Sequence, residues 1–178
     1  MDILVALSQG AGLAVACGLV ALLPLGVLAF AGLIGWLPGG LSLAAETPFV
    51  IAAWIVGLIE AAARALLPVP VRIALSAVGG GAAFELAAGA TLPFVGLAIG
   101  SIIGGGTAWT STRLIDRAIA GGGPRWGVTA IVAGAGIVAA ALAIIPIVGF
   151  ALVLVVIWAT IRARKDDQER FAGLRVLR

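Results

Sequence analysis

Long uncharged hydrophobic segments dominate the chain, and prolines and glycine clusters separate them. Residues 3–45 include no charged side chain. We predict seven apolar segments, at residues 4–22, 25–37, 49–67, 71–90, 94–120, 127–144 and 147–161. Apolar and polar residues do not alternate along them as they do in membrane β-barrel strands. Because a helix satisfies its own backbone hydrogen bonds in lipid, the pattern predicts an all-α fold.

The composition strengthens the membrane interpretation of these segments. Hydrophobic residues make up 62% of the chain and charged residues only 11%, whereas soluble domains are about half apolar and one quarter charged. The mean hydropathy is +1.23. We therefore predict a polytopic transmembrane helical bundle over residues 1–163, with membrane lipid around it, followed by a charged cytoplasmic tail at 164–178.

The distribution of charge predicts the topology. Basic residues gather in three places, namely Arg64 with Arg72, residues 113–125, and residues 162–165. The linker 38–48 contains Glu46 but no lysine or arginine. By the positive-inside rule the three basic regions face the cytoplasm of a bacterial inner membrane and the linker lies outside.

Three prolines mark where the helical hairpins break. Pro93 and Pro146 lie midway between basic regions, so each predicts a turn on the outer side, and Pro24 breaks the first segment in the same way. If residues 4–37 cross twice, the N-terminus is outside; if they form one long kinked helix, it is inside. Residues 127–161 form the closing hairpin.

Several classes of function are excluded or disfavoured by residues the chain lacks. It has one cysteine and no histidine, which argues against disulfides, His-ligated metals, haem and triads with a histidine base. No basic stripe interleaved with aromatics suggests nucleic acid. We therefore predict no enzyme, no cofactor and no metal. Cys17 ends a Leu-Ala-Val-Ala-Cys run that faintly resembles a lipoprotein box, and the alternative is a small packed thiol.

Two parts of the chain resemble each other. A shift of 69 residues aligns residues 10–35 with 79–104 without a gap and matches Gly10 with Gly79 and Pro24 with Pro93. We predict repeat units at 4–67 and 71–120. If only one crossing separates their hairpins, the units enter the membrane from opposite sides, which is an inverted-topology repeat of the kind that brackets transport pathways.

Glu85 is the sharpest candidate for a pathway or coupling residue. It lies 13 residues after Arg72, about 20 Å along a helix and near the middle of a bilayer. A carboxylate at that depth is costly and indicates function. The alternative is a protonated side chain with a neighbouring hydroxyl as partner, or a kink that brings it to an interface.

Glu60, Arg64 and Thr107 are further candidates on the pathway. Glu60 and Arg64 stand four residues apart on one helical face and are able to pair; a structural pair near the cytoplasmic edge is the alternative. Thr107 belongs to a group of hydroxyl residues that either lines a polar vestibule or bonds back to helix carbonyls.

Glycines at 96, 100 and 104 form a seam with a spacing of four residues. Such seams allow close approach of another helix. They predict packing within the chain, a homo-oligomer, or binding to partner membrane proteins.

The pattern resembles a bacterial family of small multi-pass membrane proteins known as domain of unknown function 4126. The residues that carry the resemblance are the early Gly10-Ala-Gly12, the segment with Glu60 that ends at Pro68, the Gly106-Thr107 pair that leads to Arg113, and Pro146. The resemblance implies an inner-membrane location and no established activity. In that family an acidic residue often follows the glutamate by one turn, and this chain has Arg64 there.

These observations lead to two functional hypotheses. The first is a small channel or transporter-like protein for an ion or small solute, with Glu85 and Glu60 on the path. The alternative is a structural or assembly subunit that packs against partner membrane proteins through its glycine-rich faces.

Overall fold

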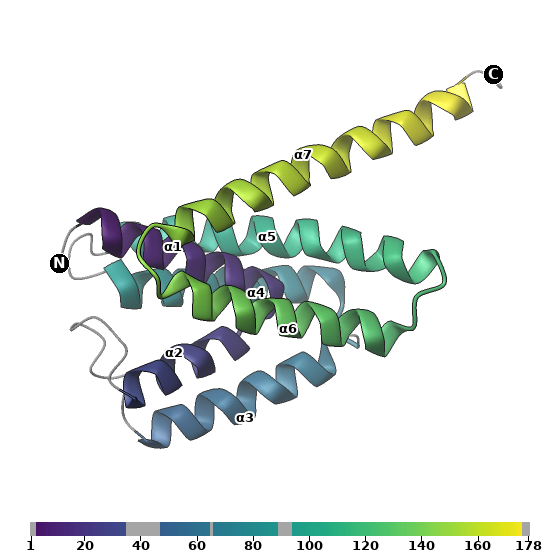
Figure 1. The fold of residues 1–178 in the computed structure, drawn as a ribbon. Helices are drawn as coiled ribbons and strands as arrows, with labels where there is room; N and C mark the ends of the chain where they lie inside the picture. The colour runs from purple at the N-terminus through teal and green to yellow at the C-terminus, as the bar shows by residue number, and fades with distance from the viewer. Residues whose placement is uncertain (1–2, 35–46, 65, 89–93, 176–178) are drawn as a thin grey trace.

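The computed structural model describes residues 3–34, 47–64, 66–88 and 94–175, and this part of the chain is all-α without a strand. Its seven helices are shown in Figure 1: α1 (Ile3–Leu19), α2 (Leu23–Leu33), α3 (Thr47–Ala63), α4 (Val69–Ala88), α5 (Val95–Ala120), α6 (Arg125–Ala143) and α7 (Val148–Arg175). The prediction of an all-α fold is confirmed. Residues 38–46 of the predicted linker 38–48 lie outside the described residues, and its last two residues begin α3.

Helix boundaries differ from the predicted segments at α3 and α7. α3 ends at Ala63 rather than at residue 67, because a proline ring at Pro68 would clash with a helical carbonyl four residues earlier. α7 instead continues to Arg175, since arginine, lysine, glutamine and glutamate favour helix. The charged tail from residue 164 therefore begins as an extension of the last helix.

The prolines predicted to break the hairpins take different positions. Pro24 lies in the first turn of α2, where a missing N–H costs nothing. Pro146 lies in the turn between α6 and α7. Pro93 is outside the described residues.

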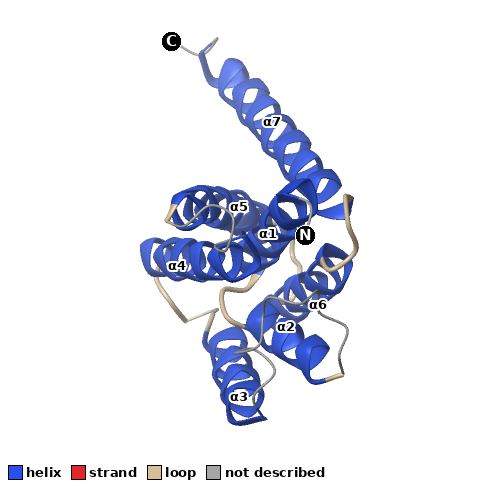
Figure 2. Cartoon of the chain, turned by 90° about the vertical axis from the view of Figure 1, so that its left-hand side faces the viewer, coloured by secondary structure: helices blue, strands red, loops and turns tan. Residues whose placement is uncertain are grey.

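Helix α1 lies at the centre of the bundle. It packs against α4, α5, α6 and α7, and Figure 2 shows it surrounded by these helices, with the α2 and α3 pair to one side. Residues 8–18 of α1 are all buried. Many of them are alanine or glycine, so neighbouring helices approach its backbone from several sides.

The glycine seam of α5 packs against α4. A Cβ added at Gly80 would lie 2.6 Å from the carbonyl oxygen of Gly100, and one added at Gly100 or Gly104 would collide with the backbone of α4. Phe84 lies against Gly96 at the far end of the seam. The seam at Gly96, Gly100 and Gly104 is therefore occupied by the chain's own helix.

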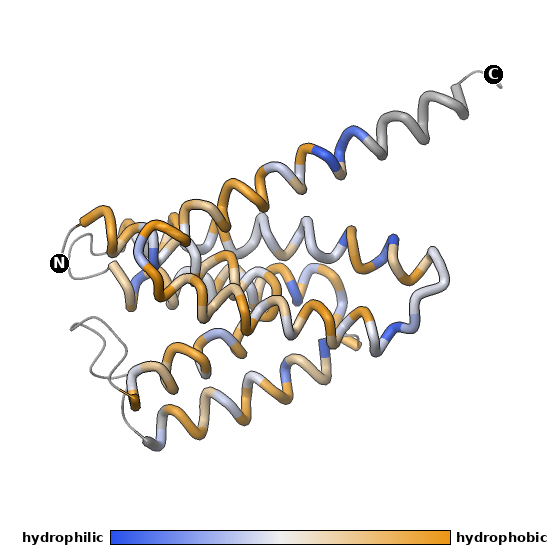
Figure 3. The backbone as a smooth tube through the Cα atoms, in the orientation of Figure 1, coloured by the Kyte–Doolittle hydropathy of each residue, from blue (hydrophilic) through white to orange (hydrophobic). Residues whose placement is uncertain are grey.

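Much of the described surface is apolar. Large aliphatic residues are exposed along α3, α5, α6 and α7, including Ile59, Ile102 and Ile131. Two helices, α4 and α6, are long and apolar enough to cross a membrane, while α1, α2 and α3 are apolar but shorter. Figure 3 shows hydrophilic residues gathered toward the end where α5 finishes and α6 begins.

Candidate functional site

The helical structure of the chain is interrupted between α1 and α2, inside the bundle. α1 ends at Leu19, and the chain bends over residues 20–22 before α2 begins. Three neighbours show how deep the bend lies. Gly79, ten residues into α4, approaches the carbonyl of Ala21, and Gly136, eleven residues into α6, approaches the side chain of Val20. These offsets correspond to about 15 Å from the starts of both helices.

The third neighbour is α5, whose Thr107 side chain contacts Gly18 so closely that a Cβ at Gly18 would collide with it. Thr107 lies 13 residues before the end of α5, about 20 Å away. The bend therefore lies well inside the bundle rather than at either end of it.

A buried ion pair lies beside this bend. Arg64 Nη1 donates to Glu60 Oε1 at 2.8 Å, and their side chains are only 2% and 5% exposed. The predicted pairing of these two residues is confirmed. Removing both charges from water is expensive, so a buried pair requires further hydrogen bonds to be tolerated.

The backbone at the bend supplies those hydrogen bonds. Arg64 Nη2 donates to the carbonyl of Gly18 at 3.2 Å, and the N–H of Leu22 donates to Glu60 Oε2 at 3.4 Å. A cation thus meets the negative end of α1 and an anion meets the positive end of α2, which is the favourable arrangement for both helix dipoles. The Ser111 hydroxyl also contacts the Gly18 carbonyl at 3.4 Å. The ion pair therefore holds the two broken helix ends.

Arg64 also lines a small cavity of about 60 Å³ between α4, α5 and α6. The cavity is bounded by Arg64, Arg72, Ile115, Asp116, Ile119, Arg125, Thr129 and Val132. Arg72 Nε donates to the carbonyl of Leu67, which fixes that side chain. The cavity brings together three arginines from separate regions of the sequence.

Glu85 occupies a different place. Its carboxylate accepts hydrogen bonds from the N–H groups of Phe94 and Leu97, both at 3.1 Å. Glu85 lies sixteen residues into α4 and three before its end, nearer the end of that helix than its middle. It therefore caps the start of α5, and its partners are backbone amides rather than a neighbouring hydroxyl.

The hydroxyl-bearing residues of α5 differ in their hydrogen bonds. Thr110 donates back to the carbonyl of Gly106 at 3.0 Å and contacts Thr160 of α7 at 2.8 Å. Thr107 is buried, and within the described part of the chain its hydroxyl has no hydrogen-bond partner. A hydrogen bond back to a helix carbonyl therefore satisfies the Thr110 hydroxyl, while Thr107 faces the end of α1 at the bend.

Sequence patterns do not predict the contacts of Gly18 and Leu22, because backbone groups carry no side-chain signal. The sequence offers Arg64 no charged partner other than Glu60. Because a guanidinium has more donors than one carboxylate accepts, this is the one clue that Arg64 needs further hydrogen-bond acceptors. Comparison with known proteins finds no matching family model, no matching curated protein and no matching solved structure.

Proposed function

We propose that the chain is a polytopic membrane protein of a bacterial inner membrane that conducts or transports an ion or small solute. Its exposed aliphatic surface supports the membrane part of this proposal. A side chain such as Ile102, 75% exposed, is unfavourable in water and favourable against lipid tails. The proposed similarity to domain of unknown function 4126 agrees with this location.

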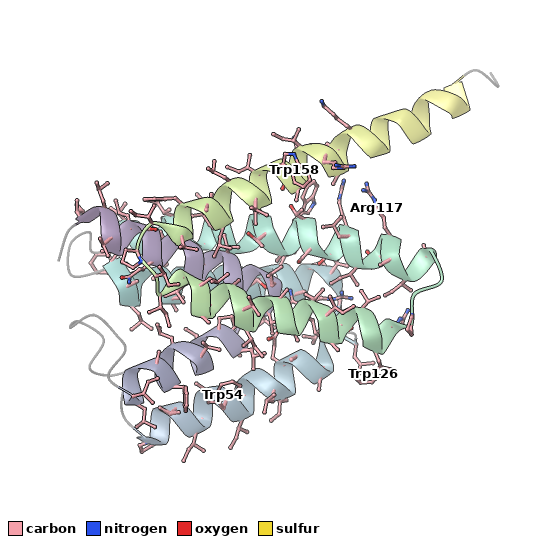
Figure 4. The ribbon with its side chains drawn as sticks, in the orientation of Figure 1. Trp54, Arg117, Trp126 and Trp158 are labelled. Atoms are coloured by element: carbon pink, nitrogen blue, oxygen red, sulfur yellow. The ribbon has the colours of Figure 1, made fainter. Side chains whose placement is uncertain are left out.

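The proposed topology places the basic end in the cytoplasm. The helix ends near Arg117 and Arg125 and the basic stretch of α7 lie toward the same end in Figures 1 and 3. Figure 4 shows Trp126 near that end, as expected for an aromatic ring at a headgroup belt, whereas Trp158 lies farther along the bundle on α7. Trp54 lies on α3 and packs against Gly26 of α2. We place the N-terminus and the turn at Pro146 outside.

The bend between α1 and α2 carries the transport proposal. At about 15 Å from the starts of α4 and α6 it would lie near the middle of a hydrocarbon core of about 30 Å. Transporters build ion and substrate sites from interrupted helices at this depth. The Glu60–Arg64 pair contacts the bend from the side where α4 and α6 begin, because Arg64 follows the last residue of α3 and shares a cavity with Arg72 and Arg125. Charged side chains buried in a membrane protein are costly and are commonly functional.

The proposed inverted repeat fits the same picture. The contacts run from Gly10 of α1 against Phe84 to Ala21, just past the end of α1, against Gly79, so α1 and α4 are antiparallel neighbours. Corresponding helices of an inverted repeat run in opposite directions through a membrane.

Ion flux into proteoliposomes tests the transport proposal. Purified protein is reconstituted, and flux of sodium, potassium, protons and chloride is compared with vesicles lacking protein. We expect flux through the wild-type protein and at least a tenfold reduction in the double variant Glu60→Gln/Arg64→Gln. The matched control Arg162→Gln changes an exposed arginine of α7 and retains flux. Absence of flux in all wild-type vesicles would reject transport.

Topology is tested separately with single cysteines. Cys17 is buried, so Cys17→Ala provides a background, and Gly122→Cys and Ile147→Cys are labelled from each side of intact cells. We expect labelling of position 147 from outside and of position 122 only after permeabilisation. External labelling of position 122 would reject the proposed inverted pairing while leaving the helices intact.

The assembly-subunit alternative has less support than transport. Its main argument is the presence of glycine-rich faces, and the seam at Gly96, Gly100 and Gly104 is already filled by α4. Co-purification with a fixed membrane partner, without flux in proteoliposomes, would favour it.

A further inference from the structure

We propose that the cavity beside Arg64 binds a small inorganic anion of the size of chloride or nitrate, and that this is the class of solute the protein moves. The second part of this inference rests on the proposed transport function. The binding site itself rests on the charge, the donors and the size of the cavity.

The charge of the cavity favours an anion. Arg64, Arg72 and Arg125 line it, against the single carboxylate of Asp116. The salt bridge found among the described residues that line the cavity joins Arg64 to Glu60, not to Asp116. Glu60, the other acid nearby, is paired with Arg64. The balance of charge around the cavity is positive.

Two helix starts add to this potential. Arg72 lies in the first turn of α4, and Arg125 and Thr129 lie in the first five residues of α6. The positive ends of both helix dipoles therefore lie near the cavity, and anions are favoured at such ends.

Arg64 has a donor left over. Its Nη1 and Nη2 groups bond Glu60 and Gly18, while Nε is buried and finds no acceptor in the described part of the chain. A buried donor without an acceptor is unfavourable. Thr129 does not supply one, because its hydroxyl donates to the carbonyl of Arg125 at 2.9 Å. Because Nε has almost no accessible surface, an anion in the cavity would interact with Arg64 through its charge and would take its hydrogen bonds from Arg72 and Arg125, which also line the cavity.

The size of the cavity limits the ligand. About 60 Å³ holds a few water molecules. One halide or nitrate ion fits within this space, whereas most of a larger organic anion such as gluconate would lie outside it. The cavity also adjoins the ion pair at the bend, because Arg64 belongs to both, so an anion bound there would lie next to the interrupted helices that carry the transport proposal.

Thermal unfolding of the detergent-purified full chain tests binding without a membrane. The protein is titrated with sodium chloride, bromide or nitrate at constant ionic strength made up with sodium gluconate. We expect the midpoint temperature to rise saturably with each small anion, because a ligand that binds only the folded state stabilises it. Equal midpoints in chloride and gluconate would overturn the proposal.

Variants locate the site. Arg125→Gln removes an exposed charge of the cavity and is expected to raise the chloride concentration for half-maximal effect at least tenfold, while Arg125→Lys restores part of it. Arg162→Gln, outside the cavity, leaves the titration unchanged. An unaltered titration in Arg125→Gln would overturn the assignment to this cavity, and Arg72→Gln serves the same purpose if Arg125→Gln does not fold.

Three further outcomes distinguish a small-anion site from a lipid site and from transport. A midpoint that rises only after anionic phospholipid is added would identify a lipid headgroup as the ligand and reject the small anion. Binding without chloride or nitrate flux in proteoliposomes would keep the site and reject transport of the anion. Flux of cations alone, without an anion effect on stability, would keep transport and reject the site.

Discussion

The α1–α2 and α4–α5 pairs share a sequence pattern but pack in opposite ways. Their first helices end at Leu19 and Ala88, which are 69 residues apart, the shift that aligns the predicted repeat. α4 and α5 lie together along the glycine seam, whereas α1 and α2 make few contacts and diverge, as Figure 2 shows. In both pairs a carboxylate accepts N–H groups at the start of the second helix.

The differing residues explain the divergence. The shift places Val27 where Gly96 lies and Ala31 where Gly100 lies, so α2 has no seam for α1. It also places Ala16 at the position of Glu85, so the first pair lacks its own capping acid. Glu60 of α3 replaces it, together with Arg64. The start of α5 is thus capped by an acid of its own helix pair, whereas the start of α2 depends on an acid from another helix.

The largest effect on stability is expected at the Glu60–Arg64 pair that holds the bend between α1 and α2. Arg64→Met leaves the Glu60 carboxylate buried without its cation and the Gly18 carbonyl without its donor. Breaking a buried ion pair by removing one partner costs about 3–5 kcal/mol. The free energy of unfolding, measured by titration with sodium dodecyl sulfate in mixed micelles, should fall by this amount.

The double variant Glu60→Gln/Arg64→Met provides the control for that measurement. It removes the uncompensated charge and should be more stable than Arg64→Met alone. A single variant as stable as the surface variant Arg162→Met would show that the pair contributes nothing to the bend.

The next effect concerns the seam of the second pair. Gly100→Ala places a methyl group against the backbone of Gly80 and should lower the free energy of unfolding by about 1–3 kcal/mol through overpacking. Gly106→Ala is the matched control on the same helix. No atom lies within 4 Å of its added Cβ, so it should gain up to about 1 kcal/mol from helix propensity. Equal results for both would mean that α4 and α5 do not meet at this seam.

Glu85 should matter for stability and not for flux. Glu85→Ala removes the acceptor for Phe94 and Leu97, and loss of such a cap costs about 0.5–2 kcal/mol. Hydrogen exchange of these two amides should become faster, while flux per folded molecule stays unchanged. A fall in flux with normal stability would return Glu85 to the pathway.

Sequence patterns are sufficient for the helices and for local pairs. Long apolar segments between prolines and glycines identify all seven described helices, and the spacing of Glu60 and Arg64 identifies their contact. They are insufficient for depth. Counting from Arg72 places Glu85 near the centre of a bilayer, but α4 begins before Arg72 and ends soon after Glu85.

The bend is equally hidden in the sequence, because its depth depends on how far α4, α5 and α6 extend past it. Its partners are the backbone groups of Gly18 and Leu22, which no residue type marks. The three arginines of the cavity are likewise brought together only by packing.

The smallest effect distinguishes the starts of α2 and α5. Phe94 has a left-handed φ of 65° and is 83% exposed, so its side chain adds backbone strain and little packing. Relief of about 1–2 kcal/mol by Phe94→Gly is partly offset by the greater backbone entropy of glycine, about 0.5–1 kcal/mol. The free energy of unfolding should therefore rise by at most about 1.5 kcal/mol.

The corresponding residue of the first pair is Leu25, which lies inside α2 with ordinary helical geometry. Leu25→Gly should lower the free energy of unfolding by about 1 kcal/mol from helix propensity alone, and by more because the side chain packs against the core. Substitutions at two aligned positions would thus have opposite signs. The same sign at both would imply that the two helix starts share one backbone geometry. The α2 start, capped by Glu60 of α3, and the α5 start, capped by Glu85 of α4, would then not differ in the way described.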